Sequence, residues 1–152
     1  MWRYFSWYSL GSLVRIDGRV NSERYIEEIL SYHLIPFLKK FEENNGEYFF
    51  QQDNVPIHTS IRTRTFMEEI EITSLPWSGQ SLDLNLIEHL WDELEYRIWA
   101  KKTHPKNLGE LKMFIQECWS QIQCEVYQKL VKSMESQIKE VIKACDYPTR
   151  YW

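Results

Sequence analysis

The chain has 152 residues, of which 43% are hydrophobic, 15% aromatic and 26% charged, with a formal net charge of −4. This length and composition predict one folded domain, residues 1–152, and exclude a disordered chain. Because acidic residues outnumber basic ones, a contact with DNA would need a local basic patch. Three cysteines without a CxxC pair exclude a disulfide framework or zinc ribbon. No apolar run approaches about 18 residues, so we expect a soluble intracellular protein without membrane association.

The N-terminal residues predict a β-hairpin followed by a helix. Residues 2–8 have strand composition, residues 9–12 (SLGS) supply a turn, and residues 13–16 form a second apolar run. After the Asp17-Gly18 turn, Asn21-Ser22 predicts a helix N-cap.

Helical periodicity continues beyond this cap. The predicted buried face comprises Tyr25, Ile26, Ile29 and Leu30. Pro36 interrupts the pattern, which predicts a kink or a restart, with the helix resuming over residues 36–42. Residues 44–46 (NNG) end that helix.

The central segment predicts a strand, a helix and a second strand. Residues 47–52 (EYFFQQ) have a Tyr-Phe-Phe core that is too continuously apolar for a one-sided surface strand, which predicts a central strand buried on both faces. Thr59-Ser60 predicts the cap of a helix that runs to about residue 70. Residues 71–75 predict a short strand, and residues 76–79 a loop.

The C-terminal half predicts three helices, over residues 85–101, 108–121 and 125–145. The buried positions expected on the first of them are Ile87, Leu90, Trp91, Leu94 and Ile98. Together with the hairpin and the central strands, these helices predict an α/β fold with a helical C-terminal end.

Two acids, Asp53 and Glu88, occupy positions suited to metal binding. Asp53 follows the predicted central strand, where open α/β sheets present ligand sites, and Glu88 lies in the first turn of a helix. Either acid alone is more often a turn former or a partner of the helix dipole. The 34 residues between them, 54–87, suffice for a helix, a strand and a turn that return the chain to the same corner. With a third acid, such carboxylates hold paired Mg²⁺ ions about 3.5–4 Å apart for attack on a phosphodiester.

Two motifs resemble the catalytic core of Tc/mariner transposases. They are residues 51–60 (QQDNVPIHTS) and residues 77–91 (WSGQSLDLNLIEHLW). The resemblance extends from residues 11–18 to residues 148–151, so it covers nearly the whole chain. It implies an RNase H-like fold and cut-and-paste DNA transposition, in which a metal-bound water nicks the ends of the element and a 3′-hydroxyl joins them to target DNA.

The resemblance also implies roles for particular residues. Asp53 and Glu88 match the second and third metal-binding acids, with Mg²⁺ or Mn²⁺ as the cofactor. The residues that would support them in the same motifs are Asn54, His58, Asp83 and Asn85. The family's first acid lies on a strand that precedes the segment matching Met1. We therefore expect a chain truncated on its N-terminal side, an incomplete mixed sheet that lacks the first strand, and no activity of the chain alone.

Several side chains have two interpretations. His58 either positions a metal ligand or phosphate, or braces the loop beside Thr59. The basic cluster is either a DNA-phosphate contact or a solvated helix end, and it consists of Lys101, Lys102 and Lys106. The tryptophans are expected in the core rather than on a base-stacking platform, and they are Trp77, Trp91, Trp99 and Trp119.

Departures from the family pattern indicate altered active-site loops and weaker DNA affinity. They are Val55, Ile57, Leu82, Leu86 and the stretch 135–137 (ESQ). The leading hypothesis is a transposase catalytic-domain remnant, nuclear by resemblance, with DNA, a full-length transposase or a second copy as partner. One alternative is a domesticated binding module for DNA or a transposase, without catalysis. The other is an active nuclease completed by upstream coding sequence that supplies the first Asp.

Overall fold

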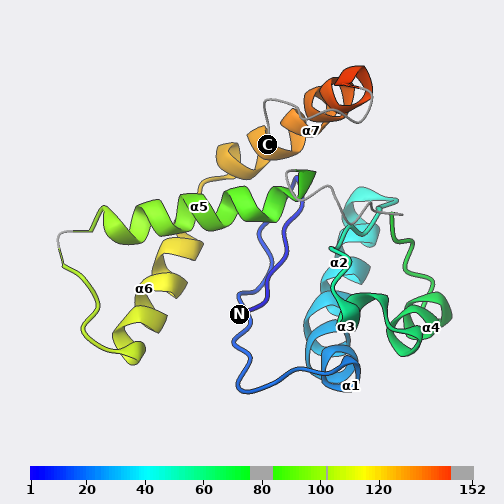
Figure 1. The fold of residues 1–152 in the computed structure, drawn as a ribbon, viewed down its shortest axis with the longest axis horizontal. Coiled ribbons are helices and arrows are strands. Elements are labelled where there is room, and N and C mark those ends of the chain that lie inside the picture. The colour runs from blue at the N-terminus through cyan, green and yellow to red at the C-terminus, as the bar shows by residue number, and fades with distance from the viewer. Residues whose placement is uncertain (76–83, 102, 145–152) are drawn as a thin grey trace. The chain divides into compact units, whose positions relative to one another are not determined.

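The computed structural model describes residues 1–75, 84–101 and 103–144 (Figure 1). The contacts within the chain group into two compact units. The first comprises Met1–Tyr4 and Val14–Leu82, and the second comprises Phe5–Leu13 and Asp83–Trp152. The predicted single domain, residues 1–152, stays a prediction.

Helices form most of the regular structure, in the order that the sequence predicts except for the short helix at residues 56–59, where the sequence predicts a turn. The first unit contains α1 (Ser22–Arg24), the π-helix η1 (Tyr25–Leu34), α2 (Ile35–Asn45), α3 (Pro56–Thr59) and α4 (Ile61–Glu69). The second contains α5 (Leu86–Trp99), α6 (Leu108–Ser120) and α7 (Cys124–Ala144). In the second unit α5 contacts both α6 and α7 (Figure 1).

Local sequence signals set the ends of these helices as predicted. The Asn21 side chain accepts a hydrogen bond from the Arg24 backbone N–H (2.9 Å), and the Ser60 side chain caps α4 through the Thr63 N–H (3.2 Å). Gly46 ends α2 with φ +84°. The expected irregularity before Pro36 takes the form of the π-helix η1, because a helix-interior proline removes one N–H and crowds the preceding turn.

The N-terminal hairpin pairs as predicted, but its turn lies earlier. Trp2 and Val14 exchange two backbone hydrogen bonds of 2.8 Å in the first unit, and Phe5 pairs with Leu10 in the second. The turn predicted at residues 9–12 was wrong. The Ser6 hydroxyl accepts the N–H groups of residues 8 and 9 and closes the turn there.

The central strand is the main correction to the predicted fold. In the described residues, β structure is limited to isolated bridges, one of which joins Phe50 to Ser74 in parallel. The prediction that residues 47–52 are buried on both faces was wrong, because Phe49 is 66% exposed. Side chains alternate along an extended segment, so Tyr48 and Phe50 pack against the first core while Phe49 faces away from it.

Each unit has its own hydrophobic core. The core of the first is built around Tyr25 and Leu30, both fully buried, with Tyr4 from the N-terminal segment and Met67 from α4. The core of the second joins one face of α5 to α6 and α7 and includes Leu90, Leu94, Ile98, Cys118, Trp119 and Tyr127. The predicted inner face of α5 is therefore confirmed.

The tryptophans divide between core and surface. Trp119 is buried and donates to the Gly11 carbonyl (3.0 Å), and Trp91 packs against the same core. Trp99 was wrongly expected in the core, because it is 62% exposed at the end of α5. Trp77 lies outside the described residues. No helix in the described part of the chain has the length and apolar character needed to cross a membrane.

Candidate functional site

Asp53 lies in the loop between the Phe50 bridge and α3. Its Oδ1 atom accepts a hydrogen bond from the Val55 backbone N–H at 3.3 Å, an interaction typical of an aspartate that shapes its own turn. The same oxygen lies 2.6 Å from Nδ1 of His58. The Asp53 side chain is 38% exposed. The carboxylate is therefore held in one orientation while it still reaches solvent.

His58 is held on α3 by its surroundings. Its side chain is only 11% exposed, and its ring lies 4.5 Å from the ring of Tyr25. The next turn is fixed by Thr63, whose hydroxyl donates to the Ile57 carbonyl at 2.6 Å. His58 therefore braces the loop through its contact with Asp53, and its role in positioning a metal ligand or phosphate stays a prediction.

Tyr25 and Gln52 complete the surroundings of Asp53 and were not recognised as part of the site from the sequence. The Tyr25 hydroxyl donates to the Gln52 side-chain carbonyl at 2.9 Å. Burial, reinforced by the nearby Asp53 carboxylate, raises the pKa of Tyr25 above its ordinary value. In the sequence Tyr25 is one of several apolar residues at helical spacing, and no local signal distinguishes it from them.

Glu88 lies in the first turn of α5, as predicted, and its side chain is exposed. Its backbone N–H donates to the Asn85 carbonyl at 3.0 Å, while the Asn85 side chain makes no capping hydrogen bond. A carboxylate in a first helical turn is favoured by the helix dipole. Asp83 lies outside the described residues, and Asn54 is exposed in the loop that follows Asp53.

The two acids fall in different units. Asp53 belongs to the first unit and Glu88 to the second, so their predicted pairing stays a prediction. Within the described residues, no three His, Cys, Asp or Glu side chains gather in a metal-binding group. The donor chemistry nevertheless suits a hard divalent cation, because both side chains offer carboxylate oxygens and both reach solvent.

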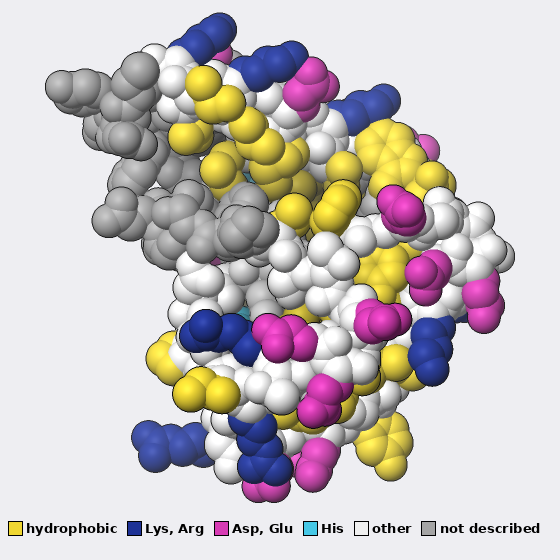
Figure 2. Space-filling view, turned by 90° about the vertical axis from the view of Figure 1, so that its right-hand side faces the viewer, with side chains coloured by type: hydrophobic (Ala, Val, Ile, Leu, Met, Phe, Trp, Pro, Cys, Tyr) yellow, Lys and Arg dark blue, Asp and Glu magenta, His cyan; other side chains and the backbone are white. Residues whose placement is uncertain are grey.

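The predicted basic cluster is partly neutralised. Nζ of Lys101 lies 2.5 Å from Oε2 of Glu117 and 4.8 Å from the centre of the Phe114 ring. Lys106 is exposed, and Lys102 lies outside the described residues. On the face shown in Figure 2, Lys and Arg side chains alternate with Asp and Glu side chains. The weak, local DNA contact expected of the cluster stays a prediction.

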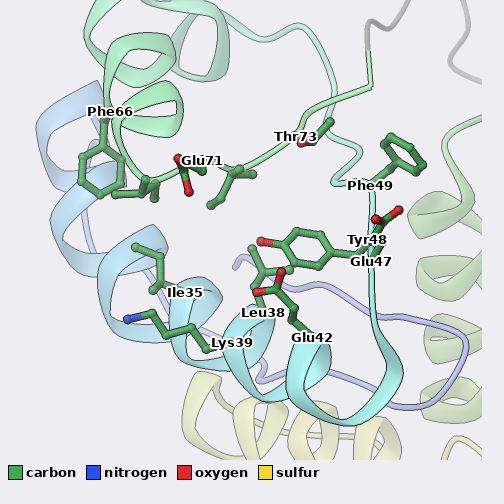
Figure 3. A pocket seen from close by; sticks show the side chains of 12 residues that line it. Ile35, Leu38, Lys39, Glu42, Glu47, Tyr48, Phe49, Phe66, Glu71 and Thr73 are labelled. Carbon is green, nitrogen blue, oxygen red and sulfur yellow. The ribbon is translucent and has the colours of Figure 1, made fainter.

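A groove of about 870 Å³ lies in the first unit, away from the predicted site residues. It is bounded by α2, residues 47–49, Phe66 and residues 70–73 (Figure 3). The carboxylate of Glu42 and the hydroxyl of Tyr48 point into it. None of its lining residues is one of the predicted metal or DNA ligands, so the groove is not part of the candidate site.

Comparisons with known proteins show what the chain is similar to. No family model matches the chain. It is 38% identical to the transposable element Tcb1 transposase of Caenorhabditis briggsae over 99% of this chain and 54% of that protein. It is 36% identical to the Tc1 transposase of Caenorhabditis elegans, again over 99% of this chain and 54% of that protein. The chain thus spans about half the length of these relatives.

A solved structure shares the fold. The Mos1 transposase catalytic domain, determined with Mn, aligns with a TM-score of 0.77 and 18% identity, and the alignment covers 97% of this chain and 76% of that one. The predicted resemblance is confirmed by these findings, whereas the predicted incomplete mixed sheet is not. Across nearly its whole length, the chain is therefore similar to transposases of the Tc1/mariner type.

Proposed function

We propose that this chain is the catalytic-domain part of a Tc1/mariner transposase and that it does not cut or join DNA on its own. The observation that carries the proposal is the 38% identity over nearly the whole chain to a transposase of which it spans about half. The orientation of Asp53 by His58 at 2.6 Å supports it from the structure. Work on chromosomal DNA would take place in the nucleus.

Asp53 and Glu88 would be two of the residues that hold Mg²⁺ or Mn²⁺. Structures of the Mos1 transposase catalytic domain contain Mn or Mg, which supports a divalent cation in the related site here. A bound cation would polarise a phosphodiester and help to generate the attacking nucleophile. The chain's own contribution is the fixed Asp53 carboxylate, held by His58 and the Val55 N–H.

The three isolated bridges would mark the strands of an RNase H-like sheet. The antiparallel pair Trp2–Val14 and the parallel pair Phe50–Ser74 both belong to the first unit. Their order and direction are those expected of a hairpin and of two neighbouring parallel strands. The fold likeness to Mos1 supports this assignment.

DNA is the proposed partner, with a second transposase copy in the assembly. Mos1 transposase has been solved as a paired-end complex with a transposon end and as a strand transfer complex, which supports both partners here. Lys106 is the exposed member of the described basic cluster and would contact phosphate.

Metal binding by the full chain tests the proposed site residues. Calorimetric titration with Mn²⁺ should show binding that is weakened by Asp53→Asn and by Glu88→Gln. Asp92→Asn, an equivalent change at an exposed residue of α5, is the control and should leave binding unchanged. Binding that survives both site substitutions would contradict the assignment.

Incubation with DNA tests the proposed lack of activity. With Mg²⁺ or Mn²⁺ and a duplex that carries terminal repeats, the full chain should give no nicked product. Cation-dependent nicking that disappears in Asp53→Asn would show the chain to be active by itself. A gel shift that weakens steeply with salt would support DNA binding. No shift at low salt would remove DNA as a partner and favour a module that binds a transposase.

A further inference from the structure

Tyr25 lies directly behind the Asp53 loop. It is the first residue of η1, its side chain is fully buried, and its backbone N–H donates to the Asn21 carbonyl at 2.9 Å. An edge-on contact with the Trp2 ring at 6.4 Å limits its movement further. A residue held in this way limits the movement of the side chains that contact it.

The ring and the hydroxyl of Tyr25 contact two different residues beside Asp53, which are His58 and Gln52. Its ring packs against the His58 ring at 4.5 Å between centroids, with 38° between the planes. Its hydroxyl donates to Oε1 of Gln52, the residue that precedes Asp53, at 2.9 Å. His58 in turn contacts Asp53 at 2.6 Å. One side chain therefore limits the orientation of the loop from the His58 side and from the Gln52 side.

The chemistry of Tyr25 suits this role. The phenol is protonated at physiological pH and can donate to Gln52, and burial raises its pKa further above the ordinary value, so it keeps this donor into the alkaline range. A π-helical segment such as η1 is often found at a functional site, where it shifts one side chain out of regular helical register.

We propose that Tyr25 is a positioning residue that fixes His58 and Gln52 and, through them, the orientation of the Asp53 carboxylate. All four residues in these contacts, Tyr25, Gln52, Asp53 and His58, belong to the first unit. The expected change in cation binding rests on the proposed function of Asp53, whereas the expected change in the orientation of His58 does not.

A spectroscopic measurement tests the contact without metal or DNA. In the ¹⁵N-labelled full chain at neutral pH, Nδ1 of His58 should have a chemical shift displaced from those of the other three histidines, because it lies 2.6 Å from a carboxylate oxygen of Asp53. Tyr25→Leu should move this shift toward theirs. Tyr25→Phe keeps the ring and should restore the shift.

Tyr4→Leu is the matched control. Tyr4 belongs to the same core, is 8% exposed, and donates its hydroxyl to the His33 carbonyl, so its loss also creates a cavity without touching His58. Both leucine variants should lose stability, but only Tyr25→Leu should change the His58 signal. An unchanged signal in Tyr25→Leu, or an equal change in Tyr4→Leu, would overturn the proposal.

Cation affinity tests the consequence. Tyr25→Leu should weaken Mn²⁺ binding about 10-fold or more, the effect usual for a residue that orients a metal ligand, and Tyr4→Leu should not. An altered His58 signal with no Mn²⁺ binding in any variant would support the positioning contact and reject the metal role of Asp53. An altered signal with unchanged affinity would overturn the effect on cation binding.

If Tyr25→Leu does not fold, the contact is tested in the unmodified chain. Nuclear Overhauser effects between the Tyr25 and His58 rings should be observed, because their centroids are 4.5 Å apart. Their absence in a folded sample would overturn the proposal.

Discussion

Nδ1 of His58 lies 2.6 Å from Oδ1 of Asp53, and this contact orders the loop that carries the candidate site. Because His58 is almost buried and Asp53 is only partly exposed, the pair should be energetically coupled. A double-mutant cycle of Asp53→Ala and His58→Ala, followed by urea unfolding, should give a coupling free energy of about 1 kcal/mol. The exposed pair Arg15 and Asp17 is the comparison and should give less. Additive effects at Asp53 and His58 would show that the contact does not stabilise the loop.

The ion pair between Lys101 and Glu117 should limit DNA binding. Glu117→Gln frees the Lys101 ammonium, so DNA affinity should rise and the salt dependence should steepen by about one phosphate contact. The neutral Glu95→Gln substitution on α5 controls for the loss of one negative charge. Adding Lys101→Ala to Glu117→Gln should remove the gain. A gain that survives this second substitution would mean that Lys101 does not contact DNA.

Local signals predicted the helices well because each is encoded within a few residues. Asn21 and Ser60 accept the hydrogen bonds expected of N-caps, and Gly46 has the positive φ expected at a helix end. The inner face of α5 follows from periodicity alone. In these places the residue type and its neighbours along the chain determine the geometry.

Longer-range features were not predictable in the same way. The aromatic core of residues 47–52 indicates burial but not which strands lie beside it, so the exposure of Phe49 could not be predicted. The contact of Tyr25 with His58 joins residues 33 positions apart, and an aromatic residue at helical spacing gives no sign of it. Lys101, just after the end of α5, similarly pairs with Glu117 on α6. Such contacts depend on tertiary packing rather than on local pattern.

The two cores should unfold together if the chain is one domain. Leu30 in the first core and Leu94 in the second are both almost fully buried, so each change to alanine should cost about 2–5 kcal/mol. In a single cooperative unit, either variant should accelerate amide hydrogen exchange in both cores by the same factor. Faster exchange confined to α5, α6 and α7 in Leu94→Ala would show that the units unfold separately.

Alkaline pH should destabilise the protein through Tyr25. Its pKa is raised in the folded state above the ordinary value of 10.0, so the unfolded chain ionises at lower pH than the folded one. The contribution of Tyr25 to the free energy of unfolding is therefore fully present below about pH 10 and is lost as pH rises further. Tyr25→Phe should therefore flatten the fall in the free energy of unfolding above about pH 10. Tyr96→Phe changes a residue that is 72% exposed and should leave the pH profile unchanged. Identical profiles for the Tyr25 and Tyr96 variants would exclude this effect.

Glu71 has an unfavourable backbone conformation that glycine would relieve. Its φ is +57°, in the left-handed region, directly after the end of α4. The Ile72 N–H donates to the Met67 carbonyl and the Glu71 N–H to the Glu68 carbonyl, which is the Schellman arrangement that favours glycine at the position of Glu71. Glu71→Gly should therefore raise the free energy of unfolding by about 1 kcal/mol in urea denaturation. Glu68→Gly, inside the same helix, should lower it by about the same amount, because glycine has low helix propensity. A loss of stability in Glu71→Gly would mean that the Glu71 side chain stabilises the fold by more than its backbone strain costs.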